Sequence, residues 1–260
     1  MAEKDFFTCS VEEKVATITI DNPPLNVLGF LQYQVLCNTI LNLINTKQAK
    51  AVIVTGTNKA FISGLDIKDI FSVKTPEEND KETLTVKVLF RQIEKLKRPV
   101  IAAIDGNCFG GGVEFSVACH LRIASREAKL GLPEINVGTI PTFGGTQRLP
   151  RLIGKAKALE LMLTGKFISG EEALSIGLVN EVCSSAELLD RAKSLARQFA
   201  SKSINAVEAV MQTTIEGLEG ELDKGIELES HVSSTLIGSY NLKEGITAFF
   251  ERRKPVFKDE

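Results

Sequence analysis

The sequence predicts an α/β body followed by an all-helical C-terminal region. Over the first hundred residues, short β-branched runs alternate with stretches whose apolar residues recur at helical spacing, which is the pattern of an α/β protein. From Ala186 onward the stretches have helical spacing, and none alternates like a strand. We therefore expect an α/β body over residues 1–195 and a helical region over residues 196–260.

The first half of the body is predicted to begin with a strand at Val15–Ile20, whose β-branched residues alternate with others. Asp21, Asn22 and two prolines then end that strand. The next predicted elements are a helix over residues 30–46, a strand over 51–55, a helix over 81–96 and a strand over 100–104. The polar stretch 72–80 is predicted to be a mobile surface segment.

The remainder of the chain, from the end of the body into the C-terminal region, is predicted to be mostly helical. Ser169 is a candidate N-cap with two glutamates after it, and Gly177 is placed to end that helix. The predicted elements are helices over residues 146–153, 156–163 and 169–176, a short strand over 179–182, and helices over 186–200, 204–217, 222–236 and 242–252.

Composition limits the classes of function. The 31 basic and 33 acidic residues give a net charge of −2, which offers no electrostatic basis for nucleic-acid binding. Five cysteines without a CxxC pair and only two histidines favour reduced thiols over disulfides and argue against a structural zinc site. No stretch approaches the ~20 apolar residues of a membrane span, and the N-terminal MAEKDFF has no signal-peptide pattern. We expect a cytoplasmic protein.

A triple glycine, Gly110 to Gly112, follows the predicted strand at 100–104. It fits neither the GxGxxG dinucleotide fingerprint nor a P-loop, and close backbone packing at a turn would also explain it. A second loop, FISGLD at residues 61–66, likewise follows a buried strand. One backbone N–H group from each loop could converge on one carbonyl oxygen, which is the design of an oxyanion hole.

Two acids accompany the glycines. Glu114 lies in the first turn of an apolar stretch, and Glu134 follows Pro133. Glu114 could simply complement a helix dipole, and Glu134 could be a solvated loop acid. Two glutamates facing one substrate could instead share the tasks of acid and base, because their mutual repulsion separates their pKa values.

Four segments, taken together, resemble the enoyl-CoA hydratase/isomerase (crotonase) superfamily. They read FISGLDI, AAIDGNCFGGGVEF, LGLPEINVGTIPTFGGTQRLPRLIG and LTGKFISGEEALSIGLVNEV. The resemblance runs in order from about residue 15 to residue 258. It implies a spiral of ββα repeats and a C-terminal helical region that builds homotrimers, which commonly stack as hexamers.

The resemblance also implies a site for an acyl-CoA thioester. The N–H groups of Ser63 and Gly111 would form the oxyanion hole, and Glu114 and Glu134 would be the catalytic acids. The substrate-binding residues would be Ser63, Gly64, Leu65, Asp66, Gly111, Leu132 and Thr142. Related hydratases usually activate water at the position of Glu114 and protonate C2 from that of Glu134.

Because both glutamate positions are filled, the resemblance favours hydration of a 2-enoyl-CoA to a 3-hydroxyacyl-CoA. This chemistry needs no metal and no cofactor beyond the coenzyme A of the substrate. The alternatives are an enoyl-CoA isomerase, a hydratase of a cyclic or dienoyl thioester, and a non-catalytic protein that only binds acyl-CoA. Leu132 and Thr142 depart from the common pattern of the family and leave the acyl group open.

Overall fold

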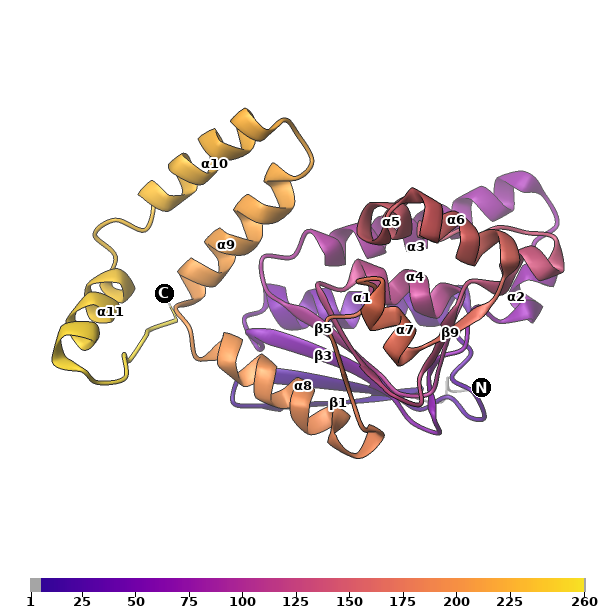
Figure 1. Ribbon diagram of the computed structural model, residues 1–260, viewed down its shortest axis with the longest axis horizontal. Coiled ribbons are helices and arrows are strands. Elements are labelled where there is room, and N and C mark those ends of the chain that lie inside the picture. The colour runs from indigo at the N-terminus through magenta and orange to yellow at the C-terminus, as the bar shows by residue number, and fades with distance from the viewer. Residues whose placement is uncertain (1–5, 260) are drawn as a thin grey trace.

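The computed structural model describes residues 6–259 as a two-sheet α/β body with an extended helical C-terminal region (Figure 1). Residues 1–5, which begin the MAEKDFF stretch, and residue 260 lie outside the described residues. The strands are β1 (Phe7–Glu12), β2 (Val15–Ile20), β3 (Ala51–Gly56), β4 (Ala60–Ile62), β5 (Val100–Ile104), β6 (Asn107–Phe109), β7 (Leu121–Ser125), β8 (Lys129–Gly131), β9 (Phe167–Ser169) and β10 (Glu181–Cys183).

Helices alternate with strands in the body, and only helices follow the last strand, β10. They are α1 (Phe30–Asn45), α2 (Ile67–Ser72), α3 (Pro76–Glu94), α4 (Gly111–Ala118), the 3₁₀ helix η1 (Pro133–Val137), α5 (Gly145–Ile153), α6 (Lys155–Thr164), α7 (Gly170–Ser175), α8 (Ser185–Ala200), α9 (Ile204–Gly217), α10 (Leu222–Ser234) and α11 (Tyr240–Glu251).

Successive pairs of strands along the chain contribute one strand to each of two sheets. The larger sheet has the order β1-β2-β3-β5-β7-β10, and the smaller has the order β4-β6-β8-β9. The pairs β3–β4, β5–β6 and β7–β8 each give one strand to each sheet, and each pair is followed by helix. Neighbouring strands from these pairs are parallel. The predicted α/β fold and its spiral of strand–strand–helix repeats are therefore confirmed.

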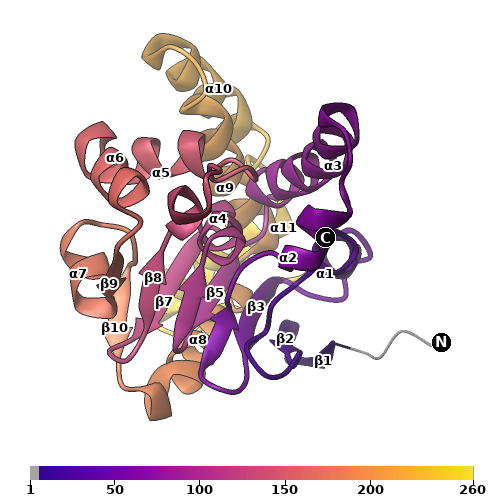
Figure 2. The same ribbon diagram turned by 90° about the vertical axis from the view of Figure 1, so that its right-hand side faces the viewer.

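Helices cover both faces of the larger sheet (Figures 1 and 2). The main core joins one face to α1, α3 and α4. On the other face, Leu188, Ala192 and Ala196 of α8 pack against buried residues of β2, β3, β5 and β7. Residue 195 thus lies inside a helix that belongs to the body, so the body continues through Ala200 rather than ending at 195.

One expectation about the body was wrong, and several of its strands were not predicted. The stretch 72–80 is not irregular, because α3 begins at Pro76, with Thr75 as its N-cap accepting a hydrogen bond from the N–H of Glu78. The edge strand β1 was not predicted, since five of its six residues are exposed and lack a buried alternation. The strands of the smaller sheet were also missed. Each has three residues, which is too few to show an alternating pattern.

The C-terminal helices α9, α10 and α11 extend away from the body (Figure 1). Polar contacts join them to it: Arg98 Nε lies 2.9 Å from Glu208 Oε1, and Lys97 Nζ donates to Gln212 Oε1 over 2.8 Å. From residue 204 to residue 259 the described chain forms the helices α9, α10 and α11 and no strand, as predicted, and residues 254–259 have no regular secondary structure.

Candidate active site

Glu114 stands in the first turn of α4, a short helix in which every residue is buried. Gly110 makes the turn into α4 with φ of 52°, a backbone region that favours glycine. A Cβ at Gly112 would lie 2.1 Å from the backbone oxygen of Ile62. The glycines therefore press the N-terminus of α4 against β4, the strand that leads into the loop at residues 63–66.

Glu114 is 1% exposed, and one oxygen of its carboxyl is hydrogen-bonded to the backbone. Its Oε1 atom accepts hydrogen bonds from the N–H groups of Phe143 and Gly145, each over 2.7 Å. Burial is the main cause that raises the pKa of Glu114 to about 8, and the charge of Glu134 adds to it. The two hydrogen bonds and the charge of Arg148 act in the opposite direction. Glu114 is thus a buried carboxyl that can hold a proton near neutral pH.

Glu134 approaches the same place from η1. A Cβ built on Gly110 would lie 2.9 Å from Glu134 Oε1, so the carboxyl lies beside the turn into α4. Its buried Oε2 atom has no hydrogen-bond partner within residues 6–259. Burial raises the pKa of Glu134 to about 7. The predicted convergence of the two glutamates is therefore present in the structure.

Two backbone N–H groups near these carboxyls are free to bind a ligand. Gly111 is the first residue of α4, where an N–H has no partner in the helix. Across from it, Leu28 donates to Gly64 O over 3.1 Å and Asp66 donates to Leu28 O over 3.0 Å. The Leu65 N–H between them has no acceptor among the described residues. A Cβ at Gly110 would lie 3.9 Å from Gly64 Cα, so the two loops are adjacent.

The expectation that Ser63 supplies one of these donors requires correction. Its N–H donates to Asn26 O over 3.3 Å and does not point freely into the site. Gly64, with φ of 115°, turns the chain after Ser63 and leaves the next N–H, that of Leu65, unpaired. Spacing along the chain could not reveal this, because Asn26 is distant in sequence and reaches the loop only in the folded protein.

Comparison with known proteins identifies the family of this chain. The family model for enoyl-CoA hydratase/isomerase matches residues 10–260. The chain belongs to the enoyl-CoA hydratase/isomerase family. It is 40% identical over 252 residues to a protein of Bacillus subtilis named "Probable enoyl-CoA hydratase", covering 96% of this chain and 98% of that protein. It is 39% identical to the "Short-chain-enoyl-CoA hydratase" of Clostridium acetobutylicum, covering 94% of each.

A solved structure of the family superimposes over the whole chain. The enoyl-CoA hydratase crystal structure from Geobacillus kaustophilus gives a TM-score of 0.94 at 34% identity, covering 100% of this chain and 98% of that one. The family relationship thus extends through the C-terminal helices as well as the body.

The other predicted site residues of this family member lie on three segments. Asp66 caps α2 by accepting a hydrogen bond from the Lys68 N–H over 2.9 Å. Leu132, 1% exposed, precedes η1. Thr142 is half-buried beside Phe143. The roles of Asp66, Leu132 and Thr142 toward substrate stay predictions.

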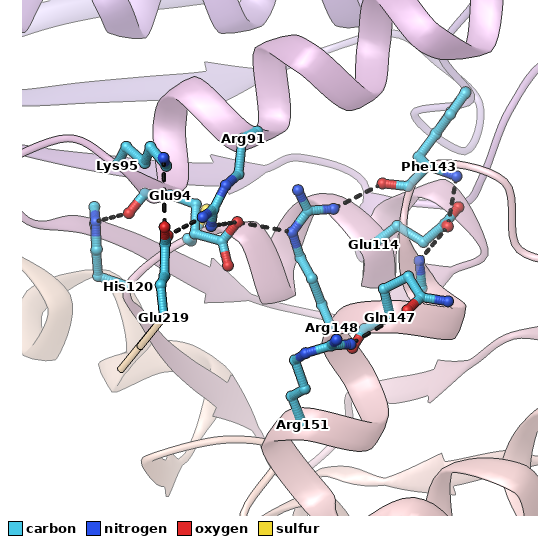
Figure 3. Close-up of polar contacts among 12 residues, drawn as sticks. Arg91, Glu94, Lys95, Glu114, His120, Phe143, Gln147, Arg148, Arg151 and Glu219 are labelled. Atoms are coloured by element: carbon cyan, nitrogen blue, oxygen red, sulfur yellow. Dashed lines mark hydrogen bonds and ion pairs between the residues drawn. The ribbon is translucent and has the colours of Figure 1, made fainter. Parts of the chain in front are cut away.

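Sequence reasoning missed four residues near Glu114. Phe143 and Gly145 hold its carboxyl, and Arg148 in turn binds the Phe143 carbonyl (Figure 3). Tyr33, on α1, is fully buried, and its hydroxyl has no partner among the described residues. The paired glycines at 144–145 were the available signal, since they free the backbone N–H groups at a helix start.

Within residues 6–259, no three His, Cys, Asp or Glu side chains are grouped so that they could hold a metal ion. None of the helices in that range has the length and apolar character needed to cross a bilayer.

Proposed function

We propose that the protein is an enoyl-CoA hydratase, which adds water across the 2,3 double bond of a 2-enoyl-CoA to give a 3-hydroxyacyl-CoA. The observation that carries this proposal is the convergence of Glu114 and Glu134 beside two free backbone N–H groups. Relatives that match nearly the whole chain bear the name enoyl-CoA hydratase. We infer that this chain acts on the same class of thioester.

The two carboxyls supply the proton chemistry. Their pKa values, about 8 for Glu114 and about 7 for Glu134, allow one to be protonated while the other is ionised near neutral pH. The ionised carboxyl takes a proton from water as the water oxygen bonds to C3. The protonated carboxyl gives its proton to C2. The product gains one water, and the pair ends the cycle with its proton on the opposite carboxyl.

We propose the N–H groups of Leu65 and Gly111 as the oxyanion hole. As water adds to C3, negative charge develops on the thioester oxygen, and two preorganised donors stabilise it without reorganising. Gly111 also stands at the N-terminus of α4, where the helix dipole favours negative charge. Because the two carboxyls move the protons and the two N–H groups stabilise the developing charge, we propose that the reaction needs no metal and no redox cofactor.

The first substrate to test is a short enoyl thioester, crotonyl-CoA, since one relative is named for short-chain enoyl-CoA. We propose that the Ser63–Asp66 loop binds the coenzyme A portion and that Leu132 and Thr142 contact the acyl group. A panel of linear, branched and cyclic enoyl-CoA thioesters, followed by loss of enoyl absorbance, distinguishes a short-chain enzyme from one for larger acyl groups.

Replacing each glutamate with glutamine tests the two-carboxyl mechanism. A glutamine Oε1 at position 114 can still accept from Phe143 and Gly145, so both variants should fold. We expect Glu114→Gln and Glu134→Gln each to lower kcat by at least ~100-fold, at the lower end of general acid–base contributions. Far-UV circular dichroism checks the fold. Full turnover in either variant would exclude the mechanism.

Isomerisation and simple binding are separated from hydration by one isotope experiment. A hydratase incorporates oxygen from H₂¹⁸O into its product, and an isomerase acting on a 3-enoyl-CoA incorporates none. A protein that only binds acyl-CoA shows affinity without turnover across the panel. We expect ¹⁸O in the 3-hydroxyacyl product.

We further propose that the protein assembles as a homotrimer or homohexamer in the cytoplasm. The C-terminal helices extend from the body and carry strongly exposed apolar side chains, with Leu222 77% and Phe249 79% exposed. Such an uncovered apolar surface is typical of a protein interface. All five cysteines are free thiols, which suits a reducing compartment.

A further inference from the structure

Arg148, on α5, connects the backbone around Glu114 to an acidic residue of α3. Its Nη1 donates to Phe143 O over 2.9 Å, and its Nε donates to Glu94 Oε2 over 3.2 Å (Figure 3). The Arg148 side chain is only 14% exposed. The fixed fork of a guanidinium can bind both partners at once, which a single ammonium does less well.

The Phe143 backbone is thereby held at both ends. Its carbonyl accepts from Arg148, while its N–H donates to Glu114 Oε1 over 2.7 Å. The Gly145 N–H, also over 2.7 Å, holds the same Glu114 oxygen. We name residues 143–145 the carboxyl-binding loop. Fixing the Phe143 carbonyl fixes the orientation of the loop, and with it the direction of both donors.

The carboxyl-binding loop is shaped around the guanidinium. Gly144 has φ of 105°, and a Cβ there would lie 2.1 Å from Arg148 Nη1. Arg148 is the fourth residue of α5, close to a helix end where a cation is slightly unfavourable. The stability of α5 therefore does not account for an arginine at this position, whereas contact with Phe143 and Glu94 does.

We propose that Arg148, anchored by Glu94, is a positioning residue that aims the N–H groups of Phe143 and Gly145 at Glu114. This inference builds on the proposed function, because it assigns the groups that prepare Glu114 for its task. Arg148 touches neither substrate nor water in this role and acts through the carboxyl-binding loop.

The ion pairs continue beyond Glu94. Arg91 Nη1 lies 2.8 Å from Glu94 Oε2, and Arg91 also pairs with Glu219, between α9 and α10. Arg91 and Glu219 are each 39% exposed, and solvent-exposed ion pairs contribute little to stability. Glu219 is therefore assigned no positioning role, and its replacement serves as a control.

The test compares arginines on one helix. Arg148→Met removes both contacts, and Arg148→Lys keeps the charge. Arg151→Met is the matched control, since Arg151 is exposed and its hydrogen bonds within residues 6–259 go to Gln147 alone. Glu219→Gln is the second control. For each full-length variant we would measure kcat and KM with crotonyl-CoA and the pKa of Glu114 from the ¹³C shift of its carboxyl.

We expect Arg148→Met to lower kcat by about 10- to 100-fold, the range for misplacing a catalytic group, with a smaller change in KM. Among the charged groups, Glu134 raises the pKa of Glu114 and Arg148 lowers it, and the charges of both glutamates raise the pKa of the buried Tyr33. Removing Arg148 should therefore move the pKa of Glu114 above its value of about 8. Arg148→Lys should recover part of both effects, and the two controls should match the parent protein.

Several results would overturn the proposal. One is a folded Arg148→Met variant whose kcat and Glu114 pKa equal those of Arg151→Met. Should Arg148→Met fail to fold, Glu94→Gln takes its place, and an unchanged Glu114 pKa with unchanged kcat there also rejects the proposal. If the parent protein hydrates no enoyl-CoA, the proposed function fails, but the Glu114 pKa still tests the positioning role.

Discussion

At the scale of single residues, Glu114 and Glu134 occupy surroundings that disfavour their charge. Burial is the largest cause of the raised pKa of both, and for Glu114 the neighbouring carboxylate adds to it. Two backbone N–H groups partly compensate at Glu114, while Glu134 Oε2 has no compensating donor within the described residues. Such uncompensated polar groups mark the part of a protein that is shaped for a ligand.

The first residue-scale prediction concerns the pH dependence of turnover. The reaction needs one protonated and one ionised carboxyl, so activity should fall at low pH, where both are protonated, and at high pH, where both are ionised. From pKa values of about 7 and about 8, the acidic limb should lie near pH 7 and the alkaline limb near pH 8. The profile of kcat/KM for crotonyl-CoA measures both limbs. A profile flat from about pH 5 to about pH 9 would contradict the shared-proton mechanism.

The second prediction concerns stability at the same residue. The folded protein raises the pKa of Glu134 from 4.5 to about 7, so the folded state binds this proton more tightly than the unfolded state. The free energy of unfolding should therefore decrease as pH rises through that interval. Because glutamine does not titrate, Glu134→Gln should have a higher Tm than the parent at about pH 8 and a smaller advantage at about pH 5.

Differential scanning calorimetry of the two proteins at both pH values measures this difference. Glu171→Gln, at an exposed residue of α7, is the control, and its Tm difference from the parent should not grow with pH. An advantage of Glu134→Gln that shrinks as pH rises would show that the charge of Glu134 is stabilised rather than penalised by folding.

At the scale of elements, the site depends on how closely α4 approaches β4. Gly112 faces the backbone oxygen of Ile62, and Gly111 faces the Tyr33 hydroxyl, which a Cβ would approach to 2.5 Å. These glycines bring the helix N-terminus, with its free N–H, next to the loop that carries the Leu65 N–H. A larger residue would separate the two donors and strain the packing.

A glycine substitution tests this contact. In Gly112→Ala the new Cβ would lie 2.1 Å from Ile62 O, a rigid backbone atom, so we expect a loss of at least about 2 kcal/mol in the free energy of unfolding. Gly220→Ala is the matched control, because nothing lies within 4 Å of a Cβ there, and it should change stability by no more than about 0.5 kcal/mol. Urea denaturation gives both values. Equal stabilities of the two variants would show that α4 can move away from β4.

At the scale of the whole molecule, the C-terminal helices carry apolar residues that the described chain does not cover. Phe249 and Phe250 stack edge to face, with centroids 5.8 Å apart, and each is more than three-quarters exposed. They line a hollow of about 470 Å³ with Leu242, Ile246 and Phe257. Covering these rings in an assembly would remove their apolar area from water.

The assembly prediction is that the parent protein is a trimer or hexamer by light scattering. Phe249→Asp combined with Phe250→Asp should shift it toward smaller species, because a carboxylate in an apolar interface is strongly unfavourable. Ser230→Asp, at an exposed polar residue of α10, adds a charge on a helix of the same region and should leave the assembly unchanged. A monomeric parent protein would reject the prediction outright.

The sequence predicted most of the long elements. The helices α1, α8 and α9 and the strands β2, β3 and β5 were predicted within a few residues, because 3.6- and 2-residue periods are properties of the local sequence. Two strands of the larger sheet, β1 and β7, were not predicted. The strands β4, β6, β8 and β9 have three residues each, which is too short for a period. They form because neighbouring repeats of the spiral place their backbones side by side.

For the site, the sequence by itself determined the residue types and their order: glycines at a helix start, one glutamate in that helix, another after a proline, and motifs that resemble one family. Only the tertiary structure decided which N–H group is free. Asn26 binds the N–H of Ser63 and leaves that of Leu65 unpaired. It also revealed Phe143, Gly145 and Arg148 around Glu114. Hydrogen-bond partners that are distant in sequence meet only in the tertiary structure, and local sequence patterns therefore do not predict them.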